Sequence, residues 1–478
     1  MTVRLIGPFN RVEGDLEVKI DIADGAVRAA WVNSPLYRGF ERILGGKDPR
    51  DALVYAPRIC GICSISQSVA AARALADAQG LAPPPNGRLA TDLVLAAENT
   101  ADHLTHFYLF FMPDFCRATY AAEPWHATAA ERFAAMSGSA AREVLVARAE
   151  FMHLFGILAG KWPHSLAIQP GGSSRAIERQ EQMRLLAILA SFRRFLEHTL
   201  FAAPLEEVAE LDSAAALDAW IDDGATAEGD FRHFLVIARA LALDRIGRAA
   251  DRFMSYGSFG MLASGLAEGG AVLPLDLDAV SEDLSHSWFT PTDGPQHPFN
   301  GRTVPDADQP NGYSWCKAPR LGGAVVEVGA FARQTVAGHP LAVDLARSAG
   351  ANVRSRVVGR LLEIARLVIA MEGWARELTP RERFCEAAPV PDEATGVGLV
   401  EAARGSLGHW LRIRNGRILN YQIVAPTTWN FSPRDAGGTP GALEQALAGA
   451  PVRDGETDLV SVQHIVRSFD PCMVCTVH

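Results

Sequence analysis

The sequence predicts an α+β fold, a mainly α chain with smaller β portions towards each end. Long helical patterns occupy the middle of the 478 residues, alternating apolar and polar residues occur near both ends, and two Cys-x-x-Cys pairs lie far apart. A site built from Cys60, Cys63, Cys472 and Cys475 requires both ends of the chain. We therefore expect residues 1–478 to form one integrated domain.

The β portions are predicted as two hairpins. Residues Leu16–Ile22 alternate apolar and charged side chains, and Ala23-Asp24-Gly25 provides a turn before a second run, Val27–Val32. Near the other end, Asn415-Gly416 separates two strand-like runs, and Asn-Gly is a strong signal for a two-residue hairpin turn. One hairpin is thus expected before each cysteine pair.

Six segments between the hairpins carry helical patterning, and Gly80 and Pro113 are expected to end the first two. The predicted helices are Ser64–Ala78, Leu89–Met112, Ala141–Leu158, Gln180–Leu200, Phe231–Met254 and Leu341–Leu378. Glycine, proline and aspartate are concentrated in Pro291–Gly312, which predicts a long loop.

Composition excludes several classes of function. There are 45 basic and 55 acidic residues, and the net charge of −10 argues against nucleic acid as the main partner. No stretch approaches the roughly 20 apolar residues of a membrane helix, so we expect no direct membrane insertion. The N-terminus lacks a signal-peptide pattern, and seven cysteines do not form an even disulfide framework. Both features favour a cytoplasmic location.

The two cysteine pairs admit three interpretations. Structural zinc commonly uses paired cysteines, but its pairs usually lie tens of residues apart, whereas 409 positions (472 − 63) separate Cys63 from Cys472. A redox disulfide needs only one pair. Spacing therefore favours a metal centre with four thiolate ligands, followed by zinc and then by a redox disulfide.

The residues around the pairs resemble the large subunit of nickel-iron hydrogenases. Arg58 precedes the first pair, and the second lies in the segment Asp470-Pro471-Cys472-Met473-Val474-Cys475-Thr476-Val477-His478. Further blocks follow the family's order along the chain, among them Arg11-Val12-Glu13-Gly14, Tyr37-Arg38-Gly39-Phe40-Glu41, Asp102-His103-Leu104-Thr105-His106-Phe107-Tyr108, Gly160-Lys161-Trp162-Pro163-His164, Lys317-Ala318-Pro319-Arg320, Arg404-Gly405 and Pro426-Thr427-Thr428-Trp429-Asn430. The resemblance implies the hydrogenase large-subunit fold with a central helical bundle, and the activity of an H2:acceptor oxidoreductase.

By this resemblance, the four cysteines hold a nickel-iron centre. Cys60 and Cys472 would be terminal ligands of nickel, while Cys63 and Cys475 would bridge nickel to an iron that carries carbon monoxide and cyanide. Soft sulfur suits such metals because it stabilises more than one redox state and can bridge two ions. The centre would cleave H2 heterolytically, and a nearby base would take the proton.

Glu13 is the predicted proton acceptor. An isolated glutamate is usually an ordinary surface residue, but the block around Glu13 matches the family, and the resemblance places it beside the thiolate of Cys472. A carboxylate buried beside metal-bound thiolates has a raised proton affinity and can give the proton up again.

Arg404, Asp102 and Asp470 form a second predicted group. Without the resemblance they would be an ordinary buried ion-pair network. In the family, the arginine faces the open side of the metal pair and one cyanide, and the carboxylates hold it in place. Thr427 would donate a hydrogen bond to the other cyanide. Many relatives have proline before this arginine, where this chain has Ala403.

A magnesium site is implied by Glu41 and His478, together with the backbone carbonyl of Ile423. A carboxylate, a carbonyl, an imidazole and waters make an octahedral set that suits magnesium. Histidine alone prefers a softer metal, so this prediction depends on the resemblance. A C-terminal histidine is otherwise a solvated tail.

Ile62 and Phe110 indicate a branch of the family. These positions line the expected gas path, and bulky residues there, with Gln67 in place of a histidine, resemble the regulatory, hydrogen-sensing hydrogenases. Plain core packing explains an isoleucine and a phenylalanine about equally well. The prediction is a hydrogen sensor that acts with a small subunit carrying iron-sulfur clusters and with a histidine-kinase-type signalling partner.

Three alternatives stay open. An energy-conserving uptake hydrogenase would have the same ligands and chemistry. A non-catalytic relative, like the quinone-site subunit of respiratory complex I, is disfavoured because both cysteine pairs are intact. The third is a structural zinc protein.

Overall fold

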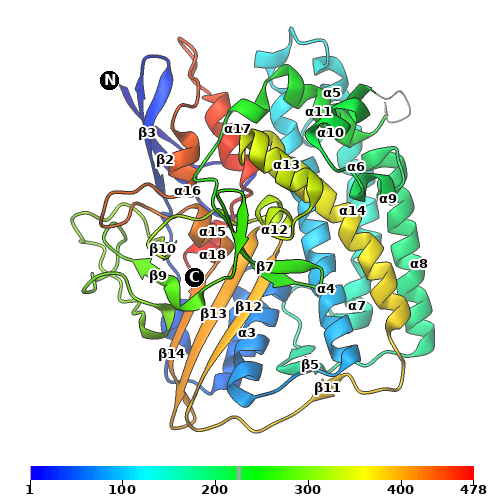
Figure 1. The fold of residues 1–478 in the computed structure, drawn as a ribbon, viewed down its shortest axis with the longest axis vertical. Coiled ribbons are helices and arrows are strands. Elements are labelled where there is room, and N and C mark those ends of the chain that lie inside the picture. Colours follow the sequence, from blue (N-terminus) through cyan, green and yellow to red (C-terminus); the bar gives the residue numbers. More distant parts are fainter. Residues whose placement is uncertain (1, 223–227) are drawn as a thin grey trace.

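The computed structural model describes residues 2–222 and 228–478. Long helices gather on one side and most strands on the other, and the C-terminus lies near the middle of the view (Figure 1). The largest cluster of buried apolar side chains contains residues from both chain ends, from Phe9 to Cys475. The mainly helical α+β fold that the sequence predicts is confirmed.

The helical side is a bundle built around α4 (Pro85–Thr105) and α14 (Val353–Glu377). Both helices are buried around most of their circumference, as expected at the centre of a bundle. α6 (Ser139–Phe151) and α8 (Arg179–Phe195) pack outside them and bury one face each (Figure 1). The other helices are α1 (Phe40–Leu44), α2 (Ala52–Tyr55), α5 (His126–Phe133), α9 (Leu205–Ala209), α10 (Ala214–Asp222), α15 (Pro426–Asn430), α16 (Ala442–Leu447) and α17 (Val460–Ser468), besides those introduced below.

The helix predicted over Leu89–Met112 begins earlier and changes type. Pro85 occupies its first turn, where a missing N–H costs nothing because no intrahelical acceptor exists there. The α-helix ends at Thr105, and a π-helical segment, His106–Phe111, continues it. The helix predicted over Gln180–Leu200 likewise ends in a π-helical turn.

Two other predicted helices are interrupted. Ala141–Leu158 contains the break between α6 and α7 (His153–Ala159). Leu341–Leu378 divides at Gly350 into α13 (Pro340–Ala349) and α14. Gly350 has a φ of 70° and a ψ of −175°, a backbone conformation that only glycine adopts without strain.

The helix predicted over Phe231–Met254 is wrong in its second half. α11 spans Asp230–Ala240, and Ala242 then takes a left-handed conformation that ends the helix. Phe253–Ser258 is a strand, β6, which pairs with β7 (Leu262–Glu268). β7 follows β6 after only three residues, but β6 is also bridged to a remote segment through Phe253 and Glu327, and its burial there overrides the local helical pattern.

The strands form five small antiparallel sheets within the described residues. Both predicted hairpins are confirmed, β2 (Glu17–Ala23) with β3 (Ala26–Asn33) and β13 (Gly405–Arg414) with β14 (Arg417–Val424). β12 (Ala394–Ala402), which the sequence patterning did not indicate, pairs with β13. The remaining strands are β1 (Thr2–Ile6), β4 (Ile168–Gln169), β5 (Gly171–Ser173), β8 (Ala271–Leu273), β9 (Val280–Asp283), β10 (Ala318–Leu321) and β11 (Cys385–Glu386).

α3 (Ser64–Gln79) lies directly on the sheet of β12, β13 and β14. A Cβ on Gly396 would lie 2.0 Å from the carbonyl oxygen of Ala74, and one on Gly398 would lie 1.9 Å from that of Ala70. Small residues on both surfaces therefore permit an approach that any larger side chain would prevent. This packing holds the start of α3, where the first cysteine pair ends, against the sheet.

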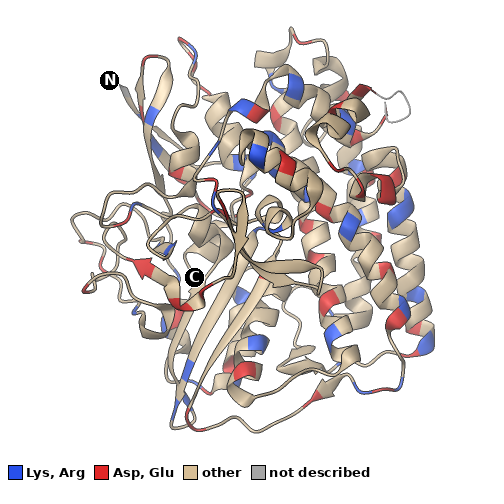
Figure 2. Cartoon of the chain, viewed as in Figure 1, with Lys and Arg blue, Asp and Glu red and all other residues tan. Residues whose placement is uncertain are grey.

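The structure confirms the long loop that the sequence predicts. Pro291–Gly312 is a loop apart from isolated bridges and one 3-10 turn, Pro298–Asn300. Acidic and basic residues are interspersed along the helices (Figure 2). Among the described residues, no helix is both long and apolar enough to cross a membrane.

Candidate metal centre

The four cysteines of the two pairs meet in the interior. Their Sγ atoms all lie within 4.8 Å of one another, and all four residues are buried. The Sγ–Sγ distance is 3.5 Å between Cys60 and Cys472 and 3.0 Å between Cys63 and Cys475. In residues 2–222 and 228–478, this is the one group of three or more His, Cys, Asp or Glu side chains that could share a metal ion.

Free thiols at these distances fit a soft transition metal. All seven cysteines are unbridged, and the closest Sγ–Sγ distance of 3.0 Å within the group far exceeds the roughly 2.05 Å of a disulfide bond. Four sulfur donors suit nickel, iron or zinc, whereas magnesium or calcium would require oxygen donors.

Each pair lies where a turn leads into a helix. Cys60 follows a 3-10 turn, Ala56–Ile59, and Cys63 precedes the first residue of α3. The amide of Cys63 donates a hydrogen bond to Sγ of Cys60 at 3.4 Å. Cys472 precedes α18 (Met473–Thr476). Backbone amides at the start of α3 favour a nearby thiolate, because the positive end of the helix dipole lies there.

Arg38 ties the two pairs together. Its guanidinium donates to the carbonyl of Ile59 at 2.5 Å and also to the carbonyl of Val474. Its backbone amide donates to the carbonyl of Val477 at 3.1 Å. One side chain thus connects the residue before the first pair with a residue between the cysteines of the second.

Glu13 lies beside the second pair. Its backbone forms a parallel β-bridge with Cys472, and the amide of Met473 donates to the carbonyl of Glu13 at 2.7 Å. The carboxyl group is half-buried, and burial, followed by the charge of Cys472, raises its pKa. The structure therefore places the predicted proton acceptor next to a predicted nickel ligand.

The four thiols differ in proton affinity. Burial by itself raises the pKa of Cys472, but hydrogen bonds from the other three cysteines and the charge of Arg404 outweigh it and lower that pKa well below its usual range. Burial raises the pKa of Cys60, and hydrogen bonding to Cys472 raises the pKa values of Cys63 and Cys475. Three of the four thiols thus hold their protons more tightly than usual. All four can be thiolates together only when a bound cation balances their negative charge.

Arg404 is held by two carboxylates next to the cysteines. Its Nη1 donates to Asp102, its Nη2 donates to Oδ1 of Asp470 at 3.0 Å, and its Nε donates to the carbonyl of Asp470 at 2.8 Å. Burial raises the pKa of Asp102 to about 7, although Arg404 opposes the shift. For Asp470, Arg404 outweighs the effect of burial and lowers the pKa. All three predicted members of this group are buried and in contact.

A small enclosed cavity adjoins the thiols. Cys63, Cys472 and Cys475 line it together with Arg404 and Thr427. The hydroxyl oxygen of Thr427 accepts a hydrogen bond from the amide of Cys472 at 3.1 Å, which leaves the hydroxyl hydrogen available to donate to another group.

The two predicted gas-path residues do not line this cavity. Ile62 is partly buried and packs against the main core. Phe110 belongs to the π-helical segment that follows α4 and is also partly exposed. The structure thus places both residues outside the wall of the space beside the thiols.

Glu41 and His478 meet in a second buried group. Nε2 of His478 lies 3.2 Å from Oε1 of Glu41, and the amide of Ile423 donates to the same oxygen at 2.8 Å. The ammonium of Lys317, which the sequence prediction did not include, donates to Oε2 of Glu41 at 2.9 Å. Burial by itself raises the pKa of Glu41, but Lys317 and His478 lower it to about 2. A magnesium ion here would therefore share an ionised carboxylate with a lysine.

Sequence reasoning also missed Arg333, which lies in α12 (Ala330–Val336). Its Nη1 donates to the carbonyl of Ala402 at 2.7 Å, and its Nη2 donates to that of Ala403 at 3.2 Å. Arg333 thus holds the backbone that leads into Arg404, at the position where many relatives have proline. No local pattern reveals this role, because the partners lie far away in the chain.

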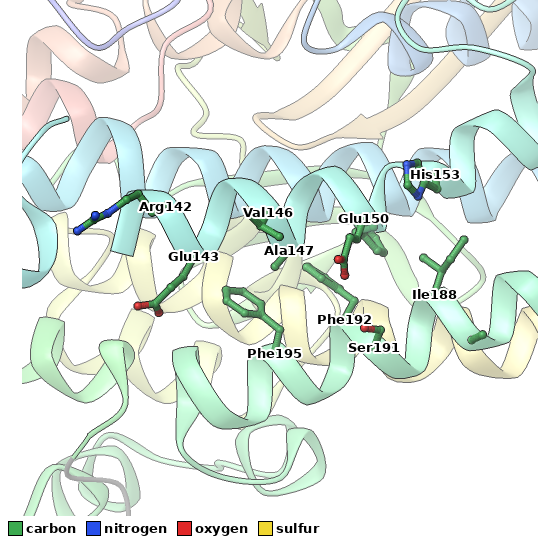
Figure 3. A pocket seen from close by; sticks show the side chains of 12 residues that line it. Arg142, Glu143, Val146, Ala147, Glu150, His153, Ile188, Ser191, Phe192 and Phe195 are labelled. Carbon is green, nitrogen blue, oxygen red and sulfur yellow. The ribbon is translucent and has the colours of Figure 1, made fainter. Parts of the chain in front are cut away.

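A separate groove of about 870 Å³ lies between α6 and α8 (Figure 3). Val146, Phe192 and Phe195 line it together with charged residues such as Arg142 and Glu150. None of the four cysteines lines this groove, so it is not part of the metal centre.

The fold and the four-thiolate site define a metalloprotein whose centre is closed by the two ends of the chain. A family model described as nickel-dependent hydrogenase matches residues 38–144 and 140–478. The periplasmic [NiFeSe] hydrogenase large subunit of Desulfomicrobium baculatum is 30% identical to this chain and covers 99% of it, with 94% of the relative covered. The uptake hydrogenase large subunit of Rubrivivax gelatinosus is 28% identical, with 99% and 95% covered.

A solved structure gives the same result. The Ni-Fe-Se hydrogenase of D. vulgaris Hildenborough superposes with a TM-score of 0.84 and 28% identity, and the match covers 100% of both chains. The chain therefore belongs to the nickel-dependent hydrogenase family. It is a hydrogenase large subunit with the fold of that family, and its four cysteines form the metal-binding group.

Proposed function

We propose that this chain is the catalytic large subunit of an uptake hydrogenase, which oxidises H2 and passes electrons to a small subunit carrying iron-sulfur clusters. The convergence of four buried thiols beside the guanidinium of Arg404 carries this proposal. The name of the Rubrivivax relative supports the uptake role. The described residues offer no second group of ligands for a metal cluster, so the electrons require a partner.

The proposed occupant of the four thiolates is nickel together with an iron that carries carbon monoxide and cyanide. When bound, this group would supply the heterolytic cleavage of H2. Cys60 and Cys472 are the proposed terminal ligands of nickel, and Cys63 and Cys475 are the proposed bridging ligands. The four Sγ atoms lie within 4.8 Å of one another, which supports a single shared centre.

The surrounding residues would hold and move the proton. The sulfur of Cys472 would take up the proton first, and Glu13 would accept it from the protonated sulfur, since the half-buried carboxyl has a raised proton affinity and lies beside that cysteine. Arg404 presents a fixed positive charge at the cavity, with Asp102 and Asp470 restricting its orientation. The hydroxyl of Thr427 would donate towards a cyanide.

We also propose that Glu41, His478 and the carbonyl of Ile423 bind magnesium. The approach of His478 to Glu41 within 3.2 Å supports a shared ion. Lys317 would move away from Glu41 or share it when the ion binds, because two cations compete for one carboxylate.

Metal analysis combined with infrared spectroscopy tests the proposed function. The chain is purified together with its small subunit, and nickel and iron are expected with infrared bands from carbon monoxide and cyanide. H2-dependent dye reduction is expected in the same sample. Zinc alone at the four thiolates, without these bands, would overturn the proposal.

A second candidate function is hydrogen sensing through a histidine-kinase-type partner, and Ile62, Phe110 and Gln67 favour it. Slow turnover that persists in air would support the sensor. The double variant Ile62→Val, Phe110→Leu should then speed the access of gas to the centre, which competition between H2 and an inhibiting gas measures. If the double variant leaves gas access to the centre unaltered, Ile62 and Phe110 do not support the sensor. For either role we propose a cytoplasmic location, which cell fractionation tests.

A further inference from the structure

Three side chains form a buried hydrogen-bonded series that ends at Cys475. Nε2 of Gln67 lies 3.8 Å from Sγ of Cys475. Oε1 of Gln67 lies 2.9 Å from Nε2 of His409, and Nδ1 of His409 lies 2.7 Å from the hydroxyl of Tyr421. Gln67, His409 and Tyr421 each expose 1% or less of their surface, so water does not compete for these bonds.

The fold explains why these residues meet. Gln67 lies in the first turn of α3, four residues after Cys63, and α3 packs closely on the sheet. His409 of β13 lies opposite Ile423 of β14, so Tyr421 is its diagonal neighbour on the same face. The two rings meet nearly edge to face, with centroids 5.5 Å apart.

The chemistry of the end groups determines the direction of every bond. A metal-bound thiolate can only accept a hydrogen bond, so Gln67 must direct its NH2 group towards Cys475 and its carbonyl oxygen towards His409. That oxygen can also only accept, and Nε2 of His409 must therefore carry a hydrogen. Nδ1 of the neutral ring is then an acceptor, and the hydroxyl of Tyr421 donates to it.

The surroundings keep the His409 ring neutral. The ring exposes none of its surface, and its two hydrogen-bond partners, Tyr421 and Gln67, are uncharged. A neutral imidazole has one donor and one acceptor nitrogen, and its partner at one nitrogen selects the tautomer. Here the partner is Tyr421, since its hydroxyl can supply a hydrogen to Nδ1, whereas the oxygen of Gln67 cannot supply one to Nε2.

We propose that His409 and Tyr421 are positioning residues that lock the amide of Gln67 with its N–H towards the thiolate of Cys475. Hydrogen bonds to metal-bound sulfur stabilise the more electron-rich state and raise the reduction potential of the centre. Loss of the lock lets Gln67 rotate, which brings a carbonyl oxygen towards an anionic sulfur. The potential of the centre then falls.

Redox titration of the holoenzyme, followed by the nickel electron paramagnetic resonance signal, tests this proposal. Tyr421→Phe and Gln67→Leu are each expected to lower the midpoint potential, with the larger shift for Gln67→Leu. The double variant should shift no further than Gln67→Leu alone, because Tyr421 acts through Gln67. Additive shifts, or a wild-type potential in Tyr421→Phe, would overturn the proposal.

Tyr120→Phe is the matched control. Tyr120 and His464 form a similar buried pair at 2.7 Å, and neither contacts the four cysteines through a hydrogen bond. This variant should retain the wild-type potential. Equal nickel content in all samples shows that the variants fold and load.

A neutron crystal structure of the holoenzyme provides a second measurement. Deuterium is expected on Nε2 of His409 and on the Gln67 nitrogen that faces Cys475, with none on Nδ1. Deuterium on Nδ1 of His409 would overturn the proposal. The potentials depend on the nickel-iron centre of the proposed function, whereas the ring protonation requires only that Cys475 is a metal-bound thiolate. Absent carbon monoxide and cyanide bands would refute the iron chemistry and leave the neutron result valid.

Discussion

Glu13 and Cys472 pair as partners in a parallel β-bridge, although they come from opposite ends of the chain. The bridge is short, and the amide of Met473 donates to the carbonyl of Glu13 at 2.7 Å. Because backbone atoms make this contact, the position of the carboxyl group relative to the thiol does not depend on a flexible side chain alone. The proposed proton acceptor and the cysteine whose protonated sulfur would supply the proton are thus placed by main-chain geometry.

Gly14→Ala is expected to disturb this bridge. Gly14 has a φ of 81°, and a Cβ there would lie 3.1 Å from both Cβ of Met473 and the amide nitrogen of Val474. The strained backbone should cost roughly 1–3 kcal/mol and displace the second cysteine pair. We expect a lower melting temperature and less nickel per chain. Gly46→Ala has a similar φ of 78° and open space around it, so it should lower stability without loss of nickel.

Glu13→Gln should leave metal loading intact and slow hydrogen–deuterium exchange by roughly 100-fold or more, since an amide cannot take the proton. The exchange is measured by mass spectrometry of the evolved gas in D2O. Asp15→Asn, which removes an exposed carboxylate two residues away, should exchange at the wild-type rate. Full exchange in Glu13→Gln would remove Glu13 from the mechanism.

Arg404→Lys should reduce H2 oxidation by about 100-fold or more while nickel is retained. Lysine keeps the positive charge but cannot donate to Asp102 and Asp470 in the fixed fork of a guanidinium. Dye reduction per nickel measures the loss. Arg50→Lys, at an exposed pair with Asp48, is the control and should be fully active. An Arg404→Lys enzyme with normal turnover would contradict the role of Arg404 at the cavity.

Glu444→Gln should remove one contribution to the pH dependence of the free energy of unfolding. Burial raises the pKa of Glu444 from 4.5 to about 7, although hydrogen bonds from Val32 and Tyr313 oppose the shift. The folded state thus holds this proton more tightly than the unfolded state. The resulting stabilisation is complete below pH 4.5 and is lost as the pH rises through about 7.

The difference in unfolding free energy between wild type and Glu444→Gln should therefore change by about 3 kcal/mol, in favour of the variant, as the pH rises from 4.5 to 7.5. Denaturant unfolding at several pH values measures it. Glu456→Gln, which removes a partly exposed carboxylate, is the control. Parallel stability curves for wild type and Glu444→Gln would contradict the raised pKa.

Local patterns predicted the fold where local forces decide it. The hairpins at Leu16–Val32 and around Asn415 were predictable because alternation and turn residues act over a few positions. The helix over Phe231–Met254 failed in its second half, because the chain there is buried against remote segments, as in the bridge between Phe253 and Glu327, which local patterning cannot reveal. The breaks inside the long helices depend on single residues such as Gly350, whose turn is set by close neighbours.

The candidate site shows the same division. The cysteines, Glu13, Arg404 and the carboxylates could be predicted from their motifs, and the structure brings them together in the interior. The contact of Lys317 with Glu41, the role of Arg333 and the bonds from Gln67 through His409 to Tyr421 could not. Their partners are backbone carbonyls and side chains on other elements, so no spacing in the chain marks them.

The sequence by itself determined the chemistry available to this protein, namely four soft sulfur donors, a base and an arginine with two carboxylates. The tertiary structure alone decided how these groups are oriented and charged. Burial and neighbouring charges depend on distances between remote segments, and they make Cys472 the most acidic of the four thiols and place Lys317 on Glu41. Such distances arise only when packing of the whole chain joins its two ends, because electrostatic interactions act through space and not along the sequence.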